Sequence, residues 1–177
     1  MYSYNQLCSA LDTVQDELIQ HNFWDTTLSK IDVYWDIYSS AYGFQNFYDD
    51  KKYGNKGSIT IPAFSRSKFQ ELFGSQYVSL KDILRHEYGH AFAYCNKKLI
   101  STIEFKNAFG GIHNNVELFE YNPNHFVSKY AALNTMEDFA ETFMYYLEYS
   151  GILATKFNHP IIARKWKFIS HLSNLKS

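Results

Sequence analysis

The stretch His86-Glu87-Tyr88-Gly89-His90 has the pattern HExxH and lies within a segment that predicts a helix. Ser79 and Asp82 form a Ser-x-x-Asp capping signal immediately before an apolar run. The apolar residues that follow recur at the spacing of one helix face: Ile83, Leu84, Tyr88, Ala91 and Phe92. This periodicity predicts a helix of about 17 residues that carries the whole motif.

The motif has the donor set of a zinc site. Two histidines four residues apart lie on one face of a helix, so His86 and His90 can converge on one Zn²⁺ ion. Glu87 can accept a proton from water at the open coordination position. The motif alone also fits a surface helix with a solvated glutamate. Gly89 costs about 1 kcal/mol relative to alanine inside a helix, which indicates close approach of another backbone or tight core packing.

A third metal ligand must come from elsewhere in the chain, because a catalytic zinc has three protein ligands and one open position. A histidine six residues after His90 would fall at Asn96, which excludes that extended motif. Cys95 lies off the ligand face of the helix, and Cys8 is distant in sequence and has no CxxC partner. The remaining candidate ligands are acidic.

A second predicted helix, capped by Asn134 or Thr135, carries two glutamates on one face. Its apolar stripe consists of Phe139, Phe143, Met144 and Leu147. We predict that Glu137 binds zinc and that Glu141 accepts the outer ring N–H of a ligand histidine, which fixes the tautomer of that ring. The alternative is an ordinary solvated acidic face.

The sequences HEYGHAF at residues 86–92 and EDFAETF at residues 137–143 resemble the gluzincin metallopeptidases. The pattern is most similar to the catalytic domain of anthrax lethal factor and the related Pro-Pro endopeptidases. In that family the third ligand is a glutamate on a later helix, and a tyrosine seven residues before it points into the active site. The resemblance implies this role for Tyr130, for which a core or surface tyrosine is the alternative. It covers residues 79 to about 147.

Length and composition are those of a small globular enzyme. The chain has 177 residues, 46% of them hydrophobic, with only 3 Pro and 8 Gly, which predicts one domain over residues 1–177. A net charge of −1 indicates no nucleic-acid partner, and the basic run Arg164–Lys167 is predicted to be a solvated face. No segment resembles a membrane span or a signal peptide. Two well-separated cysteines favour a cytoplasmic protein with reduced thiols, while signal-less secretion and the oligomeric state stay open.

The rest of the chain predicts an α+β fold, specifically a zincin-like domain with a small twisted sheet. An amphipathic N-terminal helix contains Leu7, Leu11, Val14 and Leu18, and a closing helix covers Pro160–Leu175. Strands are predicted at Ile31–Ile37 and Ser58–Pro62, the second at a sheet edge because of its proline. Further predictions are a short helix at Ser65–Phe73, strand-like pieces at Ile100–Phe105 and Val116–Tyr121, and a turn at Gly110-Gly111.

The combined hypothesis is a zinc-dependent endopeptidase that acts on a peptide or protein substrate. His86, His90 and Glu137 would bind Zn²⁺, and Glu87 would act as the general base. By the resemblance, Tyr130 would donate a hydrogen bond to the oxyanion. The substrate would lie extended beside the predicted Ser58–Ile61 edge strand.

Two other functions remain open at this stage. One is a hydrolase with the same machinery that acts on a non-peptide amide or a small molecule. The other is a toxin-like effector module that acts mainly through a protein partner. The five remaining histidines, His21, His113, His125, His159 and His171, have no partner at ligand spacing. His113 and His125 lie between the two predicted metal-binding helices, so either could line the cleft.

Overall fold

The computed structural model of the chain describes residues 2–36, 43–46, 57–63, 67–68, 79–110 and 120–175. The strands are β1 (Ile31–Asp36), β2 (Gly43–Asn46) and β3 (Gly57–Pro62). The helices are α1 (Tyr4–Gln20), α3 (Leu80–Cys95), α4 (Lys97–Ile100), α5 (Ile103–Phe109), α6 (Thr135–Glu148) and α7 (Pro160–Leu175). Single 3₁₀ turns cover Leu28–Lys30 (η1), Tyr130–Ala132 (η2) and Thr155–Phe157 (η3). The predicted α+β class is confirmed.

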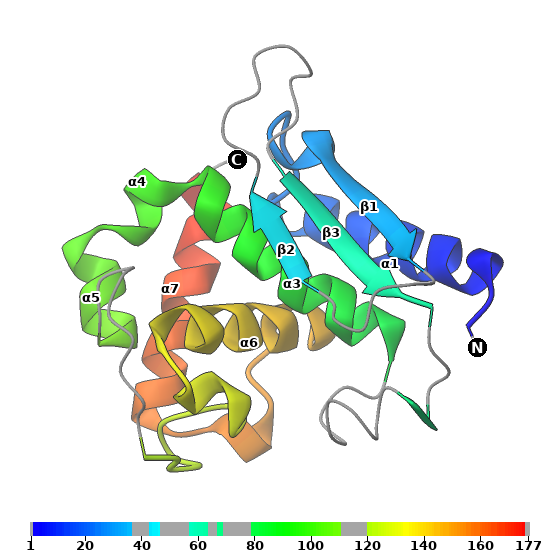
Figure 1. Cartoon of the computed structure of the whole chain (residues 1–177). Helices are drawn as coiled ribbons and strands as arrows, with labels where there is room; N and C mark the ends of the chain where they lie inside the picture. Colours follow the sequence, from blue (N-terminus) through cyan, green and yellow to red (C-terminus); the bar gives the residue numbers. More distant parts are fainter. Residues whose placement is uncertain are drawn as a thin grey trace.

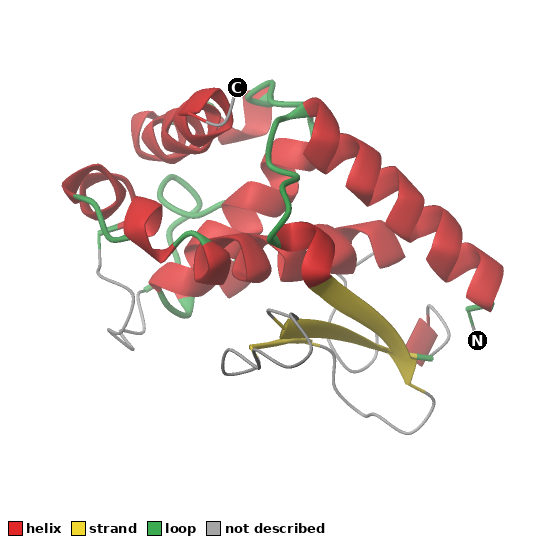
Figure 2. Ribbon diagram, turned by 90° about the horizontal axis from the view of Figure 1, so that it is seen from above, coloured by secondary structure: helices red, strands yellow, loops and turns green. Residues whose placement is uncertain are grey.

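The sheet and the helices form two layers. Figure 1 shows the sheet in the order β1-β3-β2, and Figure 2 shows the long helices gathered on one side of it. Helix α3 is central, because it contacts β2 and β3 as well as α1 and α6. None of the described helices is both long and apolar enough to span a lipid bilayer. The HExxH helix therefore lies between the sheet, α1 and α6, the helix that carries Glu137.

The buried apolar side chains form one continuous cluster that includes residues of α1, the sheet, α3, α6 and α7. Phe23, in the loop after α1, packs between the two helices that carry the predicted metal ligands. Its ring centroid lies 5.3 Å from that of Phe92 on α3 and 4.8 Å from that of Phe143 on α6. Aromatic packing of this kind holds α3 and α6 at a fixed separation.

The helix boundaries follow the predicted capping signals. The Ser79 hydroxyl accepts a hydrogen bond from the Asp82 backbone N–H and starts α3. Asn134, rather than Thr135, caps α6 through bonds from the N–H groups of Met136 and Glu137. The N-terminal helix, the Ile31 strand and the closing helix Pro160–Leu175 are also confirmed. Of the predicted Gly110-Gly111 turn, Gly110 ends α5 in a left-handed conformation, and Gly111 lies outside the described residues.

The prediction that Ser58–Pro62 forms an edge strand is wrong, because β3 is the central strand of the sheet. It pairs in parallel with β1 and antiparallel with β2. Pro62 is tolerated because it lies two residues beyond Thr60, where the described pairing with β2 ends. Its missing N–H therefore breaks no bond of the described pairing between β2 and β3. A substrate cannot add to the covered part of this strand.

The strand predicted at Ile100–Phe105 is also wrong, since α4 ends at Ile100 and α5 begins at Ile103. The Thr102 hydroxyl accepts the Phe105 N–H and caps α5. A short apolar run fits both the helix period of about 3.6 residues and the strand period of about 2. The Thr102 cap favours the helix here. The predicted helix Ser65–Phe73 and strand Val116–Tyr121 lie mostly outside the described residues.

The basic run Arg164–Lys167 is not a solvated face throughout, because Lys165 is buried. Its Nζ lies 2.6 Å from Asp138 Oδ2 on α6 and donates to the His125 carbonyl oxygen at 2.6 Å. It also lies 4.4 Å from the centroid of the Phe126 ring. A buried carboxylate needs a partner of opposite charge, so Lys165 joins α7 to α6 and to the loop before η2.

Candidate metal centre

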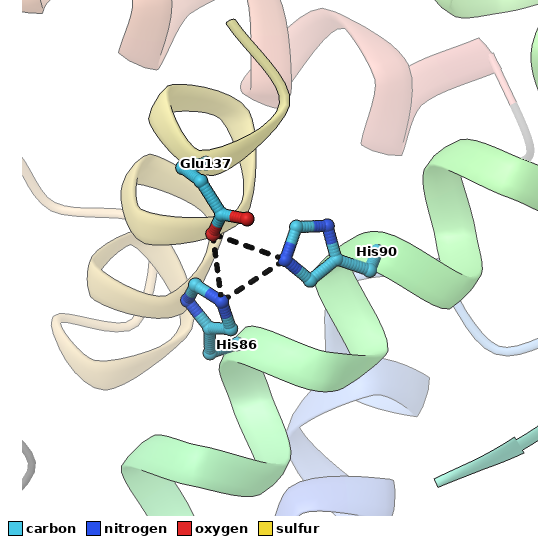
Figure 3. Close-up of side chains that lie close together, drawn as sticks. All are labelled: His86, His90 and Glu137. Atoms are coloured by element: carbon cyan, nitrogen blue, oxygen red, sulfur yellow. Dashed lines mark hydrogen bonds and ion pairs between the residues drawn. The ribbon is translucent and has the colours of Figure 1, made fainter. Parts of the chain in front are cut away.

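Three predicted ligand atoms meet between α3 and α6 (Figure 3). His86 Nε2 lies 3.0 Å from His90 Nε2 and 3.2 Å from Glu137 Oε2, and the His90-to-Glu137 distance is also 3.2 Å. Atoms that bind a tetrahedral zinc at about 2.0–2.1 Å are about 3.3–3.4 Å apart. The triangle therefore has nearly the size that a zinc ion requires. Among the described residues, it is the group whose donor atoms could hold a metal ion.

The contact between His86 and Glu141 determines which ring nitrogen of His86 carries the proton and which presents a lone pair. Nδ1 lies 2.8 Å from Glu141 Oε1, and the carboxylate assigns the proton to Nδ1. The Nε2 lone pair of a neutral His86 then points at another ring nitrogen and at a carboxylate oxygen. A cation between the three atoms would satisfy all of them, so the residues present fit a divalent metal.

The electrostatic field of the site favours positive charge at this point. Burial lowers the pKa of His86, but the hydrogen bonds to Glu137 and Glu141 outweigh it and raise the pKa to about 10. Burial raises the pKa of Glu137, but the bonds to His86 and His90 outweigh it and lower the pKa to about 2. Glu137 is therefore anionic, and the surroundings of His86 favour a positive charge at this point. A metal ion bound between them would supply that positive charge.

Glu87 and Tyr130 lie beside the same triangle. Glu87 is 2% exposed, and its charge acts on both His86 and Tyr130. The Tyr130 ring centroid is 5.7 Å from that of His86. Burial, and then the Glu137 and Glu87 carboxylates, raise the pKa of Tyr130 to about 12. Tyr130 is therefore a neutral phenol near pH 7 and can donate a hydrogen bond.

Comparison with protein families adds an independent finding. Residues 55–173, well over half of the chain, match the family described as "Putative zinc-binding metallo-peptidase". The chain belongs to this family. Neither the curated proteins nor the solved structures gave a match. The matched range of this metallopeptidase contains β3, α3 and α6, and thus both halves of the candidate metal centre.

A glycine lets α3 and α6 approach each other closely. A Cβ atom at Gly89 would lie 3.1 Å from Ala140 Cα and 3.4 Å from Ala140 O. Backbone therefore packs on backbone one turn from the ligands, as the glycine in the HExxH motif predicted. Close approach at this point brings Glu137 and Glu141 within reach of the histidine rings.

We expect Gly89→Ala to push α6 outward by a few tenths of an ångström and to weaken metal binding. The extra methyl group overpacks the crossing by about 1–3 kcal/mol, offset in part by the helix propensity of alanine. Thermal unfolding should show a melting temperature lower by about 2–4 °C, with about tenfold weaker zinc binding. Gly43→Ala is the control, because, its chain neighbours aside, no atom of the described residues lies within 4 Å of its added Cβ. Equal zinc affinity in both variants would contradict this role of Gly89.

A salt bridge absent from the sequence predictions anchors the motif helix. Arg85, next to the first histidine, points away from the metal centre and binds Glu17 on α1 through two contacts of 2.7 Å. It also bonds Asp82 at 2.9 Å. Paired contacts between guanidinium and carboxylate set orientation as well as energy. Helix α1 lies outside the family match but holds α3 in place through this pair.

Ser128 is a site residue that sequence reasoning missed. Its hydroxyl donates to Glu141 Oε2 at 2.5 Å, so both oxygens of this buried carboxylate are bonded. A serine at the start of a 3₁₀ turn is a local capping signal. No pattern in the sequence, however, could have placed it against a glutamate thirteen positions later.

The other candidates do not join the centre. His125 is half-buried near Phe126 and His159, with ring centroids 6.4 Å and 6.1 Å away. His113 lies outside the described residues. In the described part of the chain, neither Cys8 nor Cys95 forms a disulfide bond.

Proposed function

We propose that this chain is a zinc-dependent endopeptidase of the gluzincin type, with His86, His90 and Glu137 as the metal ligands. One observation carries the proposal: donor atoms from the HExxH helix and from a later helix converge at 3.0–3.2 Å, and the charge of Glu87, the residue after His86, acts on that ring. His90 and Glu137 each keep 19% side-chain exposure, which gives water and substrate a route to the centre.

A zinc ion held by these three residues would lower the pKa of water towards neutrality and polarise the substrate carbonyl. The Glu87 carboxylate accepts the proton of the attacking water and passes it to the leaving amine. The neutral Tyr130 phenol donates a hydrogen bond to the oxyanion. Glu141 holds the proton on His86 Nδ1 and so keeps Nε2 turned to the metal.

The substrate would lie along β2, in place of the β3 edge predicted from the sequence. The strand order β1-β3-β2 makes β2 an edge strand, and β2 contacts the motif helix α3. In the described part of the chain, β2 pairs with β3 alone. An extended peptide could add to it through backbone hydrogen bonds.

Incubation with a proteome-derived peptide library, with and without a chelator, tests the proposed function. We expect cleavage that stops when zinc is removed and returns when zinc is added. Elemental analysis of the protein should show close to one zinc per chain. The double variant with His86→Ala and His90→Ala should lose this zinc. Full zinc in the double variant would contradict the ligand assignment. A zinc-loaded protein that cleaves no peptide would favour a non-peptide amide substrate or a binding role.

Tyr130→Phe removes one oxygen atom and should lower turnover by about 100–1,000-fold, the usual effect of losing one oxyanion donor. Zinc content, KM and melting temperature should stay close to wild type, because the ring remains in place. Steady-state kinetics on a cleaved peptide measure the effect. The exposed Tyr121 in the same segment is the matched control for the Tyr-to-Phe change. A loss of less than about threefold would assign Tyr130 to the packing of the protein instead.

A further inference from the structure

Ser128 lies where the metal centre and the tyrosine turn meet. Its hydroxyl donates to Glu141 Oε2 at 2.5 Å and accepts the Ala131 N–H at 3.0 Å. Glu141 in turn bonds the ligand histidine His86, and Ala131 directly follows Tyr130 in η2. Two bonds therefore connect the outer carboxylate of the metal centre to the turn that carries the phenol.

The Ser128 hydroxyl can make both bonds at once, because it donates in one and accepts in the other. A serine has one proton to donate and two lone pairs to accept with. The proton is committed to a carboxylate that has no solvent exposure, and a lone pair takes the backbone N–H. Ser128 itself is buried, so water does not compete for either bond. Alanine at this position would leave both Glu141 Oε2 and the Ala131 N–H without this partner.

The first residue of the turn is weakly capped. Its N-cap residue, Lys129, makes no side-chain capping bond, and the backbone bond from the Ala132 N–H to the Lys129 oxygen is long at 3.3 Å. The ring of Tyr130 must nevertheless stay 5.7 Å from the His86 ring. Hydrogen-bond geometry within a 3₁₀ turn is poor, so the bond from the Ala131 N–H to Ser128 helps to hold the turn and its tyrosine in place.

We propose that Ser128 is a positioning residue that aligns the Tyr130 phenol with the metal ligands. The inference rests on the proposed function, because it gives Tyr130 the oxyanion role. Ser128 acts through the turn: loss of its hydroxyl lets η2 shift, and the phenol then misses the developing charge. The metal ligands themselves keep their places, since Glu141 retains its bond to His86.

A double-mutant cycle tests the inference on a cleaved peptide. Ser128→Ala should lower kcat by about 10–100-fold, with KM and zinc content near wild type. In a Tyr130→Phe background, the same change should cost less than about twofold, because the group it positions is already gone. Ser128→Thr keeps the hydroxyl and should recover most of the activity. Ser173→Ala, at a buried serine on α7, is the matched control and should have no effect.

The cycle separates this inference from the proposed function. An equal loss in both backgrounds would show that Ser128 acts on the metal or the fold, and would overturn the inference while leaving the peptidase intact. No loss from Ser128→Ala would also overturn it. Failure of the peptidase function itself would appear elsewhere, as wild-type cleavage by Glu87→Gln or as cleavage that persists without zinc.

A second readout does not depend on activity. In protein labelled with ¹³C-tyrosine, the ring signal of Tyr130 is the one missing from the Tyr130→Phe spectrum. Ser128→Ala should shift or broaden that signal, whereas Ser173→Ala should leave it in place. An unchanged Tyr130 signal in Ser128→Ala would overturn the inference even if no peptide substrate had been found.

Discussion

Replacing Glu87 by glutamine is expected to lower turnover by about 100–10,000-fold while the protein keeps its zinc. Glutamine has nearly the same shape but cannot take a proton from water. Glu87 contributes none of the three converging donor atoms, so the metal should stay bound. Turnover of a cleaved peptide and zinc per chain, measured on the same preparation, give both halves of the result.

The Glu87→Gln result needs a control, because the side chain is buried next to His86. Loss of its charge should weaken metal binding slightly, since that charge favours a positive His86. Zinc must therefore be kept in excess during the assay. Glu104→Gln, on the exposed first turn of α5, is the matched change outside the site. Cleavage by Glu87→Gln at the wild-type rate would rule out Glu87 as the base.

Replacing Glu137 by alanine should remove most of the bound zinc, and with it the activity. The change deletes one of three ligand atoms and leaves His86 and His90 to hold the ion alone. Glu141→Ala should instead weaken zinc affinity by about 10–100-fold, because it removes the partner of His86 Nδ1 but no ligand. Titration with a zinc chelator ranks the two variants. A smaller effect of Glu137→Ala than of Glu141→Ala would mean that their roles are reversed.

Asp138 tests the register of the same helix. It follows Glu137 but points to the other side, into the buried ion pair with Lys165. Asp138→Ala should keep zinc in the folded protein. It should also lower the melting temperature on the order of 10 °C, because an unpaired buried lysine costs about 3–5 kcal/mol. Release of zinc by Asp138→Ala, with zinc retained in Glu137→Ala, would place the ligand one residue later.

Local patterns in the sequence were enough to predict the two helices that meet at the centre, α3 and α6, and the histidines and glutamates that they bring together. HExxH inside an apolar helical repeat places two rings on one face, and a glutamate pair four residues apart places two carboxylates on another. The caps at Ser79 and Asn134 set where these helices begin. Each of these signals acts within one or two turns, so the chain encodes it without reference to the rest of the fold.

Contacts between distant segments were decided by the tertiary structure alone. The sequence could show that Pro62 weakens a strand, but not that β3 pairs with both β1 and β2 and so lies in the centre of the sheet. It could show that Lys165 is basic, but not that a buried aspartate on α6 requires it. It also left Ser128 unremarked, because the partner that gives the hydroxyl its role lies on another helix. Which residue a side chain or strand contacts depends on which surfaces of the protein pack together, and this packing involves the whole chain. Helix caps and hydrophobic periodicity, in contrast, depend only on neighbouring residues.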